Sequence, residues 1–173
     1  MDAPYSKFAI SLKQSKGKSD AHKIVDALLI GALEPFFPSL AKFTDGFVKF
    51  TFSKEKQVGN VKTRYALRKL NCVYSGNEIF EDDMSVEHIV PESASASSCN
   101  IGNLILLETK LNGIAGEKNY QDKKEIYGQS KSKWISSFVA ENDCWDASKI
   151  DDRAKSMAKV YYERVFKKSV DTK

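Results

Sequence analysis

Apolar residues recur at helical spacing near the start of the chain. Residues 21–34 carry them three or four positions apart, and Asp20 stands where a helix cap is expected. Pro35 and Pro38 predict the end of this helix. Residues 1–19 are polar, with Ser, Lys and Gly interspersed, so we expect a loose start.

A second periodic stretch is VKTRYALRKLN, residues 61–71, which predicts a helix with one apolar and one basic face. The basic side chains are Lys62, Arg64, Arg68 and Lys69. Between the two helices, residues 47–52 alternate in polarity after a turn at Asp45-Gly46. That pattern is typical of a strand, although a helix is also possible.

The pattern changes between residues 71 and 112, where short apolar runs are separated by polar turns. Met84–Val90 and Asn103–Glu108 predict two strands, joined by the serine- and alanine-rich stretch PESASASSCN. From Lys110 onward helical spacing returns, and the last predicted helix covers 150–167. The order is therefore helices, a small strand pair, then helices, which predicts an α+β protein.

Composition fits a soluble protein with one main domain. The chain has 173 residues, of which 42% are apolar and 29% charged. No apolar run approaches the roughly 20 residues needed to span a bilayer, and the first 20 residues do not resemble a signal peptide. We expect a cytoplasmic protein with no membrane partner. The three cysteines have no C-x-x-C spacing and are expected to be isolated thiols.

Charge is distributed unevenly. The first 70 residues carry 13 Lys/Arg and 6 Asp/Glu, whereas the remainder carries 14 and 17. A basic amino-terminal part suits a polyanion such as nucleic acid. A solvated lysine-rich surface would give the same pattern.

Of the two histidines, His88 has the more informative surroundings. His22 lies in the amphipathic first helix, where a structural role is the simpler interpretation. His88 follows Glu87 in SVEHIVPES, and Pro91 favours a bend that could bring the two side chains toward one centre. Asn103 precedes the second strand and Asn112 follows it.

These residue types suit metal-assisted hydrolysis of a phosphodiester. A carboxylate and an amide supply hard oxygen ligands, which Mg²⁺ or Mn²⁺ prefers. A histidine that titrates near neutral pH can deprotonate water, while the metal stabilises charge on the leaving oxygen.

The motifs SVEHIVPES and NIGNLILLETKLN resemble those of HNH (ββα-metal) nucleases, with spacings of 15 from His88 to Asn103 and 9 from Asn103 to Asn112. The closer resemblance is to the C-terminal HNH domain of GmrSD-type restriction enzymes. It rests on HIVP, GNLILL, LN and KKEIY at 123–127, and it covers roughly residues 61–167.

The resemblance implies a mostly helical α+β fold with a small ββα-metal core of two antiparallel strands and a helix. We therefore expect a basic helical N-terminal extension (1–60), the HNH nuclease domain with C-terminal helices (61–167) and a flexible tail (168–173). His88 would be the general base that activates the attacking water. Asn103 would fix the loop and orient the histidine. Glu87 and Asn112 would bind the metal, with glutamate standing where many relatives have aspartate.

Three basic residues are weaker candidates for phosphate contact: Lys123, Lys124 and Arg153. A solvated helix face is the alternative for the lysines, and Arg153 could instead tie helices together through a carboxylate. Trp134 and Trp145 are expected in the core. Ser75 replaces the second cysteine of a zinc-binding pair found in some relatives, so no structural zinc is expected at Cys72.

The sequence therefore predicts a metal-dependent endonuclease that cuts DNA and serves bacterial defence, and the resemblance implies products with a 3′-hydroxyl and a 5′-phosphate. One alternative is a catalytically inactive nucleic-acid-binding subunit of a defence complex, and another is a nuclease that acts on RNA. An ATPase partner is a further possibility, because the sequence has no P-loop motif of its own.

Overall fold

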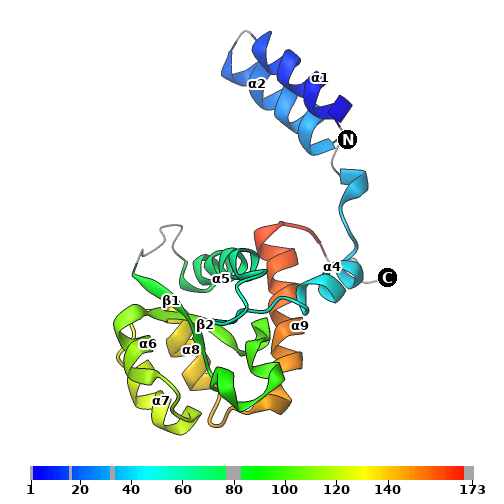
Figure 1. The fold of residues 1–173 in the computed structure, drawn as a ribbon. Helices are drawn as coiled ribbons and strands as arrows, with labels where there is room; N and C mark the ends of the chain where they lie inside the picture. The colour runs from blue at the N-terminus through cyan, green and yellow to red at the C-terminus, as the bar shows by residue number, and fades with distance from the viewer. Residues whose placement is uncertain (1, 16, 32–33, 77–82, 170–173) are drawn as a thin grey trace. The chain divides into compact units, whose positions relative to one another are not determined.

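A computed structural model describes residues 2–15, 17–31, 34–76 and 83–169 (Figure 1). The chain divides into two compact units, Met1–Ser39 and Leu40–Lys173. Phe47 and Phe52 belong to the hydrophobic core of the second unit. Of the expected tail, residues 170–173 lie outside the described residues.

The first unit is built from helices. Its elements are α1 (Asp2–Lys13), α2 (Lys18–Ile24), a π-helix (Val25–Ile30) that continues α2, and a short 3₁₀ turn (Glu34–Phe36). The expectation of a loose start is wrong, because α1 packs against both α2 and the π-helix. The helix predicted from residue 21 begins at Lys18, and Gly17 rather than Asp20 occupies its cap position.

The second unit contains the predicted strand pair. Strands β1 (Met84–His88) and β2 (Leu104–Glu108) are antiparallel, with His88 opposite Leu104 and Met84 opposite Glu108. Helix α6 (Thr109–Ala115) follows β2 without a break. This order of two strands and a helix confirms the expected mostly helical α+β class.

Helices surround the hairpin (Figure 1). They are α4 (Leu40–Phe47), α5 (Asn60–Ser75), α7 (Tyr120–Tyr127), α8 (Lys133–Glu141) and α9 (Ile150–Val160), which continues as a π-helix (Tyr161–Val165). Helices α5, α6 and α8 all contact β2. Residues 104–107 are therefore buried without alternation, as expected for a strand covered on both faces.

The loop between the strands, residues 89–103, contains three short 3₁₀ turns: Glu92–Ala94, Ala96–Cys99 and Ile101–Asn103. Gly102 in the last turn packs directly on α9. A Cβ atom at this position would collide with the carbonyl group of Ile150, so only glycine allows the approach. The glycine of the GNLILL motif thus sets how closely the loop lies to α9.

Residues 48–54, here called the covering segment, run beside this loop. Helix α4 ends at Phe47, and Thr51 then pairs with Asn100 in an isolated antiparallel bridge. The Phe52 amide donates to the Cys99 carbonyl at 2.9 Å. Of residues 47–52, Phe47 ends α4 and residues 48–49 form a turn, so the alternating pattern gives a single bridge at Thr51 in place of the predicted strand.

None of the helices in the part of the chain that the structure describes is long and apolar enough to cross a membrane.

Candidate active site

His88 occupies the last position of β1 and is buried, with 5% of its surface exposed. Its Nε2 atom lies 3.0 Å from the backbone carbonyl oxygen of Phe52 in the covering segment. A carbonyl has no proton to give, so this hydrogen bond requires the proton on Nε2. The lone pair of the neutral ring is then on Nδ1.

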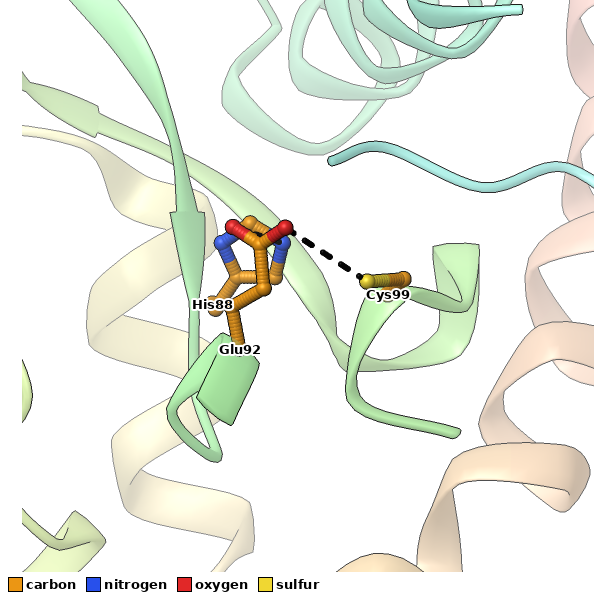
Figure 2. Close-up of side chains that lie close together, drawn as sticks. All are labelled: His88, Glu92 and Cys99. Atoms are coloured by element: carbon orange, nitrogen blue, oxygen red, sulfur yellow. Dashed lines mark hydrogen bonds and ion pairs between the residues drawn. The ribbon is translucent and has the colours of Figure 1, made fainter. Parts of the chain in front are cut away.

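Glu92 lies beside the imidazole, four residues further along the chain (Figure 2). Its Oε2 atom is 3.9 Å from His88 Nε2, and its Oε1 atom accepts from Cys99 Sγ at 3.7 Å. The carboxylate also accepts from the Lys54 amide at 3.1 and 3.3 Å. Burial raises the pKa of Glu92, but hydrogen bonds from Ser53 and Lys54 and the nearby His88 outweigh it, so the pKa lies below its usual value.

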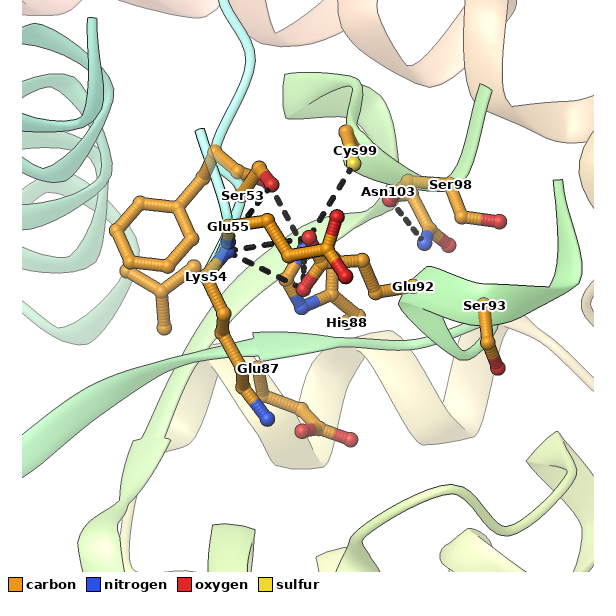
Figure 3. Close-up of polar contacts among 12 residues, drawn as sticks. Ser53, Lys54, Glu55, Glu87, His88, Glu92, Ser93, Ser98, Cys99 and Asn103 are labelled. Atoms are coloured by element: carbon orange, nitrogen blue, oxygen red, sulfur yellow. Dashed lines mark hydrogen bonds and ion pairs between the residues drawn. The ribbon is translucent and has the colours of Figure 1, made fainter. Parts of the chain in front are cut away.

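Asn103 is fully buried and holds the loop in place (Figure 3). Its Nδ2 donates to the carbonyls of Val90 and Ser98 at 2.7 and 2.8 Å. Its Oδ1 accepts from the Val90 amide at 2.9 Å and from Trp145 Nε1 at 3.1 Å. The Asn103 side chain thus joins both ends of the loop that carries Glu92. This loop begins directly after β1, which ends at His88.

Glu87 lies on the opposite face of β1 from His88, as neighbouring strand residues do. Its Oε1 atom is 2.8 Å from Lys123 Nζ and also accepts from the Tyr127 hydroxyl at 2.8 Å. Lys123 Nζ donates in addition to the His88 carbonyl at 2.6 Å. Glu87 and Lys123 are 3% and 0% exposed, so they form a buried ion pair below the sheet.

This ion pair bears on two of the expected roles. Lys123 cannot contact a phosphate from a fully buried position, and its role is to neutralise Glu87. Burial, followed by the charge of Glu87, raises the pKa of the Tyr127 hydroxyl, which therefore stays protonated as a donor. Glu87 Oε1 already binds the Lys123 ammonium and the Tyr127 hydroxyl, so this oxygen is not available to a metal ion in this arrangement.

Asn112 projects from α6 toward β1. Its Nδ2 donates to Ser85 Oγ at 2.9 Å and to the Val86 carbonyl at 3.0 Å. The side chain thereby fastens the helix of the ββα core to the first strand. Asn112 and Glu87 have different partners: Asn112 binds β1 at Ser85 and Val86, whereas the Glu87 carboxylate binds Lys123 and Tyr127 of α7.

Two grooves adjoin the covering segment on the surface of the second unit. One has a volume of about 770 Å³ and is lined by Ser53, Lys54, Lys56, Glu92, Ser93 and Cys99, among others. The other, about 560 Å³, lies along α5 and includes Lys54, Arg64 and Arg68. Lys54 lines both grooves, so basic side chains extend from α5 to the neighbourhood of His88.

Comparison with protein families matches residues 37–160 to the GmrSD restriction endonucleases, C-terminal domain. The match covers the ββα core, the loop and most of the surrounding helices. The chain belongs to this family. The resemblance inferred from the HIVP and GNLILL motifs is thereby confirmed. Among curated proteins, no match to the chain was found.

Within this GmrSD C-terminal domain, Arg153 has a structural position. Its Nη1 donates to the carbonyls of Gly102 and Leu104 at 2.7 and 2.9 Å. The guanidinium lies 4.8 to 5.6 Å from the ring centres of Trp134, Phe138 and Trp145. Burial lowers the pKa of Arg153 to about 10. Arg153 ties α9 to the start of β2, through carbonyls and not through a carboxylate, and its contact with a phosphate stays a prediction.

The remaining predicted residues also have defined positions. Lys124 is partly exposed on α7, and its Nζ is 3.7 Å from Asp143 Oδ1. Trp134 and Trp145 are 4% and 8% exposed, which confirms that they belong to the core. The side chain of Lys124 is 27% exposed, whereas that of Lys123 is fully buried.

Sequence reasoning missed the partners that the fold brings to His88. Phe52 lies 36 positions before His88 in the chain. Phe52 and Lys54 make their contacts through backbone atoms, which any residue type would supply, so no sequence motif marks them. Glu92 could have been noticed, since it follows His88 by four residues. Among the described residues, one group of His, Cys, Asp and Glu side chains is close enough to hold a metal ion: His88, Glu92 and Cys99, with ligand atoms within 4.8 Å of one another.

Proposed function

We propose that this protein is an HNH-type endonuclease that hydrolyses phosphodiester bonds in DNA, with His88 as the general base. The observation that carries the proposal is the ring of His88, whose Nε2 is bound to the Phe52 carbonyl and whose Nδ1 keeps the lone pair. Membership of a restriction endonuclease family supports DNA as the substrate.

The residues around His88 have distinct tasks in this reaction. The proton of the attacking water passes to Nδ1, and the Phe52 carbonyl holds the ring in the required tautomer. Glu92 Oε2, 3.9 Å from Nε2, stabilises the imidazolium that forms. Asn103 is a positioning residue, since it fixes the loop without contacting the imidazole.

The family resemblance implies a Mg²⁺ or Mn²⁺ ion, which when bound would stabilise charge on the phosphate and on the leaving oxygen. The predicted ligands fit this ion incompletely. The amide of Asn112 is a suitable oxygen donor, but the Glu87 carboxylate is already neutralised by Lys123. A requirement for the ion is therefore part of the proposal, whereas Glu87 as its direct ligand is not.

The test is cleavage of plasmid DNA with Mg²⁺ or Mn²⁺, comparing wild type with His88→Ala. General-base catalysis is typically worth about 10²- to 10⁴-fold, so a loss of at least that order is expected. His22→Ala is the matched control, because His22 is exposed and belongs to the first unit. Equal cleavage by wild type and His88→Ala would contradict the assignment.

We further propose that DNA lies along the groove on α5. Arg64 is exposed, lines this groove with Arg68 and Lys54, and stands 5.6 Å from the ring centre of Phe52, which contacts His88. Arg64→Gln should weaken DNA binding at low salt. It should also reduce the slope of log K against log salt concentration by about 1, since one phosphate contact is lost. Lys155→Gln, on α9 and paired there with Asp151, is the control and should leave binding nearly unchanged.

The competing proposal is an inactive nucleic-acid-binding subunit, favoured by the basic groove on α5. It predicts salt-sensitive DNA binding that survives His88→Ala, together with no cleavage under any divalent cation. Parallel reactions with single-stranded DNA and RNA decide which nucleic acid is cut. RNA cleavage without DNA cleavage would replace the substrate in the leading proposal.

The family name supports a role in the restriction of foreign DNA. We also propose an ATPase partner, since nucleotide-dependent regulation would have to come from another domain or chain. Co-purification of an ATPase with the tagged protein, and a change in cleavage rate on adding ATP, would support this. Full cleavage activity of the isolated chain, unaffected by the co-purified ATPase and ATP, would count against it.

A further inference from the structure

We infer that His88, Glu92 and Cys99 form a binding site for a thiophilic divalent ion such as Zn²⁺, and that this ion switches the general base off. The three side chains supply an imidazole nitrogen, a carboxylate oxygen and a thiol sulfur. Zinc binds this combination of ligands in proteins. The proposed site does not include the Glu87 and Asn112 side chains expected to hold Mg²⁺.

The distances permit an ion with little rearrangement. Glu92 lies between the other two, with Oε2 at 3.9 Å from His88 Nε2 and Oε1 at 3.7 Å from Cys99 Sγ, and all three ligand atoms lie within 4.8 Å (Figure 2). Zinc–ligand bonds of about 2.0 to 2.3 Å in a tetrahedron place neighbouring ligand atoms roughly 3.3 to 3.6 Å apart. The side chains therefore need to close by about 1 Å.

The surroundings provide both support and access. The Lys54 amide donates to the Glu92 carboxylate, and Ser53 and Lys54 of the covering segment lie beside the cluster (Figure 3). Glu92 and Cys99 line the open groove of about 770 Å³, so an ion can enter from solvent. A water molecule from the groove would complete the four ligands.

The donor set selects the class of ion. Cys99 is a soft ligand, and Mg²⁺ prefers an octahedron of oxygen atoms with several waters. Burial, followed by the charge of Glu92, raises the pKa of the Cys99 thiol, so without metal it is protonated. An ion that binds must displace this proton, which Zn²⁺ and Co²⁺ do and Mg²⁺ does not.

The consequence for His88 follows from proton balance. When Zn²⁺ bonds to Nε2, the hydrogen bond to the Phe52 carbonyl is lost and the ring proton moves from Nε2 to Nδ1. The thiol proton of Cys99 is released to solvent as the zinc–sulfur bond forms. Both ring nitrogens are then occupied, so the ring cannot accept a proton from water. This inhibition rests on the proposed function, whereas the binding of the ion does not.

The first test is titration of the metal-free protein with Co²⁺, whose thiolate complexes show a charge-transfer band in the near ultraviolet. Wild type should give the band at one equivalent, and Cys99→Ser should lose it and bind at least about 10-fold more weakly. Cys144→Ser, at an exposed thiol, is the matched control and should retain the band. No band in wild type, or a band that survives Cys99→Ser, would overturn the site.

The second test measures DNA cleavage in Mg²⁺ with increasing Zn²⁺, each variant relative to its own zinc-free rate. Zinc should inhibit wild type and Cys144→Ser equally, and Cys99→Ser should require at least about 10-fold more zinc. A Cys99-dependent cobalt band without zinc inhibition would overturn the switch and leave the binding site standing. Absence of all cleavage in Mg²⁺ and Mn²⁺ would refute the proposed function, and the cobalt titration would still decide the site.

Discussion

The buried ion pair below the hairpin gives the sharpest prediction about stability. Replacing Lys123 by Met keeps most of the side-chain volume but removes the ammonium that contacts Glu87 Oε1 at 2.8 Å and the His88 carbonyl at 2.6 Å. Glu87, at 3% exposure, would then keep only the Tyr127 hydroxyl as a partner. Removing one partner of a buried pair costs about 3 to 5 kcal/mol, because the remaining charge is uncompensated.

That loss is large compared with the total stability of a domain, which is about 5 to 15 kcal/mol. For a chain of this length, each kcal/mol lowers Tm by roughly 2 to 4 °C, so a decrease of about 6 to 20 °C is expected. The assay is urea unfolding followed by tryptophan fluorescence, supported by a thermal melt. Trp134 and Trp145 are both buried in the folded state, which makes the signal sensitive to unfolding.

The neighbouring residue supplies the control. Lys124→Met removes a charge from the same helix, but its partner Asp143 is fully exposed, so the expected cost is below about 1 kcal/mol. Adding Glu87→Gln to Lys123→Met removes the stranded charge and should recover part of the lost stability. A cost for Lys123→Met below about 1 kcal/mol, or no recovery in the double variant, would refute the reasoning.

Three further predictions concern the loop beside His88. Gly102→Ala should destabilise the fold by about 1 to 3 kcal/mol in a thermal melt, because its Cβ would collide with Ile150; Gly113→Ala, with open space around it, should not. Asn103→Ala leaves four buried hydrogen-bonding groups without a partner and should lower the free energy of unfolding in urea by about 3 kcal/mol. A decrease within 1 kcal/mol would be inconsistent with the observed contacts. The folded pKa of Glu92 lies below the usual 4.5, so its contribution to stability is present above pH 4.5 and is lost as the pH falls through the folded pKa. Wild type should therefore lose stability in this acid range more steeply than Glu92→Gln, and parallel curves for the two proteins would contradict the pKa shift.

Much of the second unit could be predicted from local sequence pattern. Branched apolar runs predicted the two strands, and helical spacing predicted α5 and the closing helix α9, because both patterns reflect which face of an element is buried. The HIVP and GNLILL motifs predicted the ββα order for the same reason: their spacing encodes strand, loop and strand. Helix α1 was missed, since its support comes from packing against α2 and not from a strong periodicity of its own.

By itself, the sequence determined the secondary structure of the ββα core, the family and the position of His88 at the end of a strand. Only the tertiary structure decided which side chains meet. It placed Glu87 against Lys123 on one face of β1, and it placed Phe52, Glu92 and Cys99 around His88 on the other. The physical reason is that burial of a charge demands a partner, and the partner can come from any distance along the chain. A motif states the order of residues, whereas the packing of α7 and of the covering segment determines what each of them can bind.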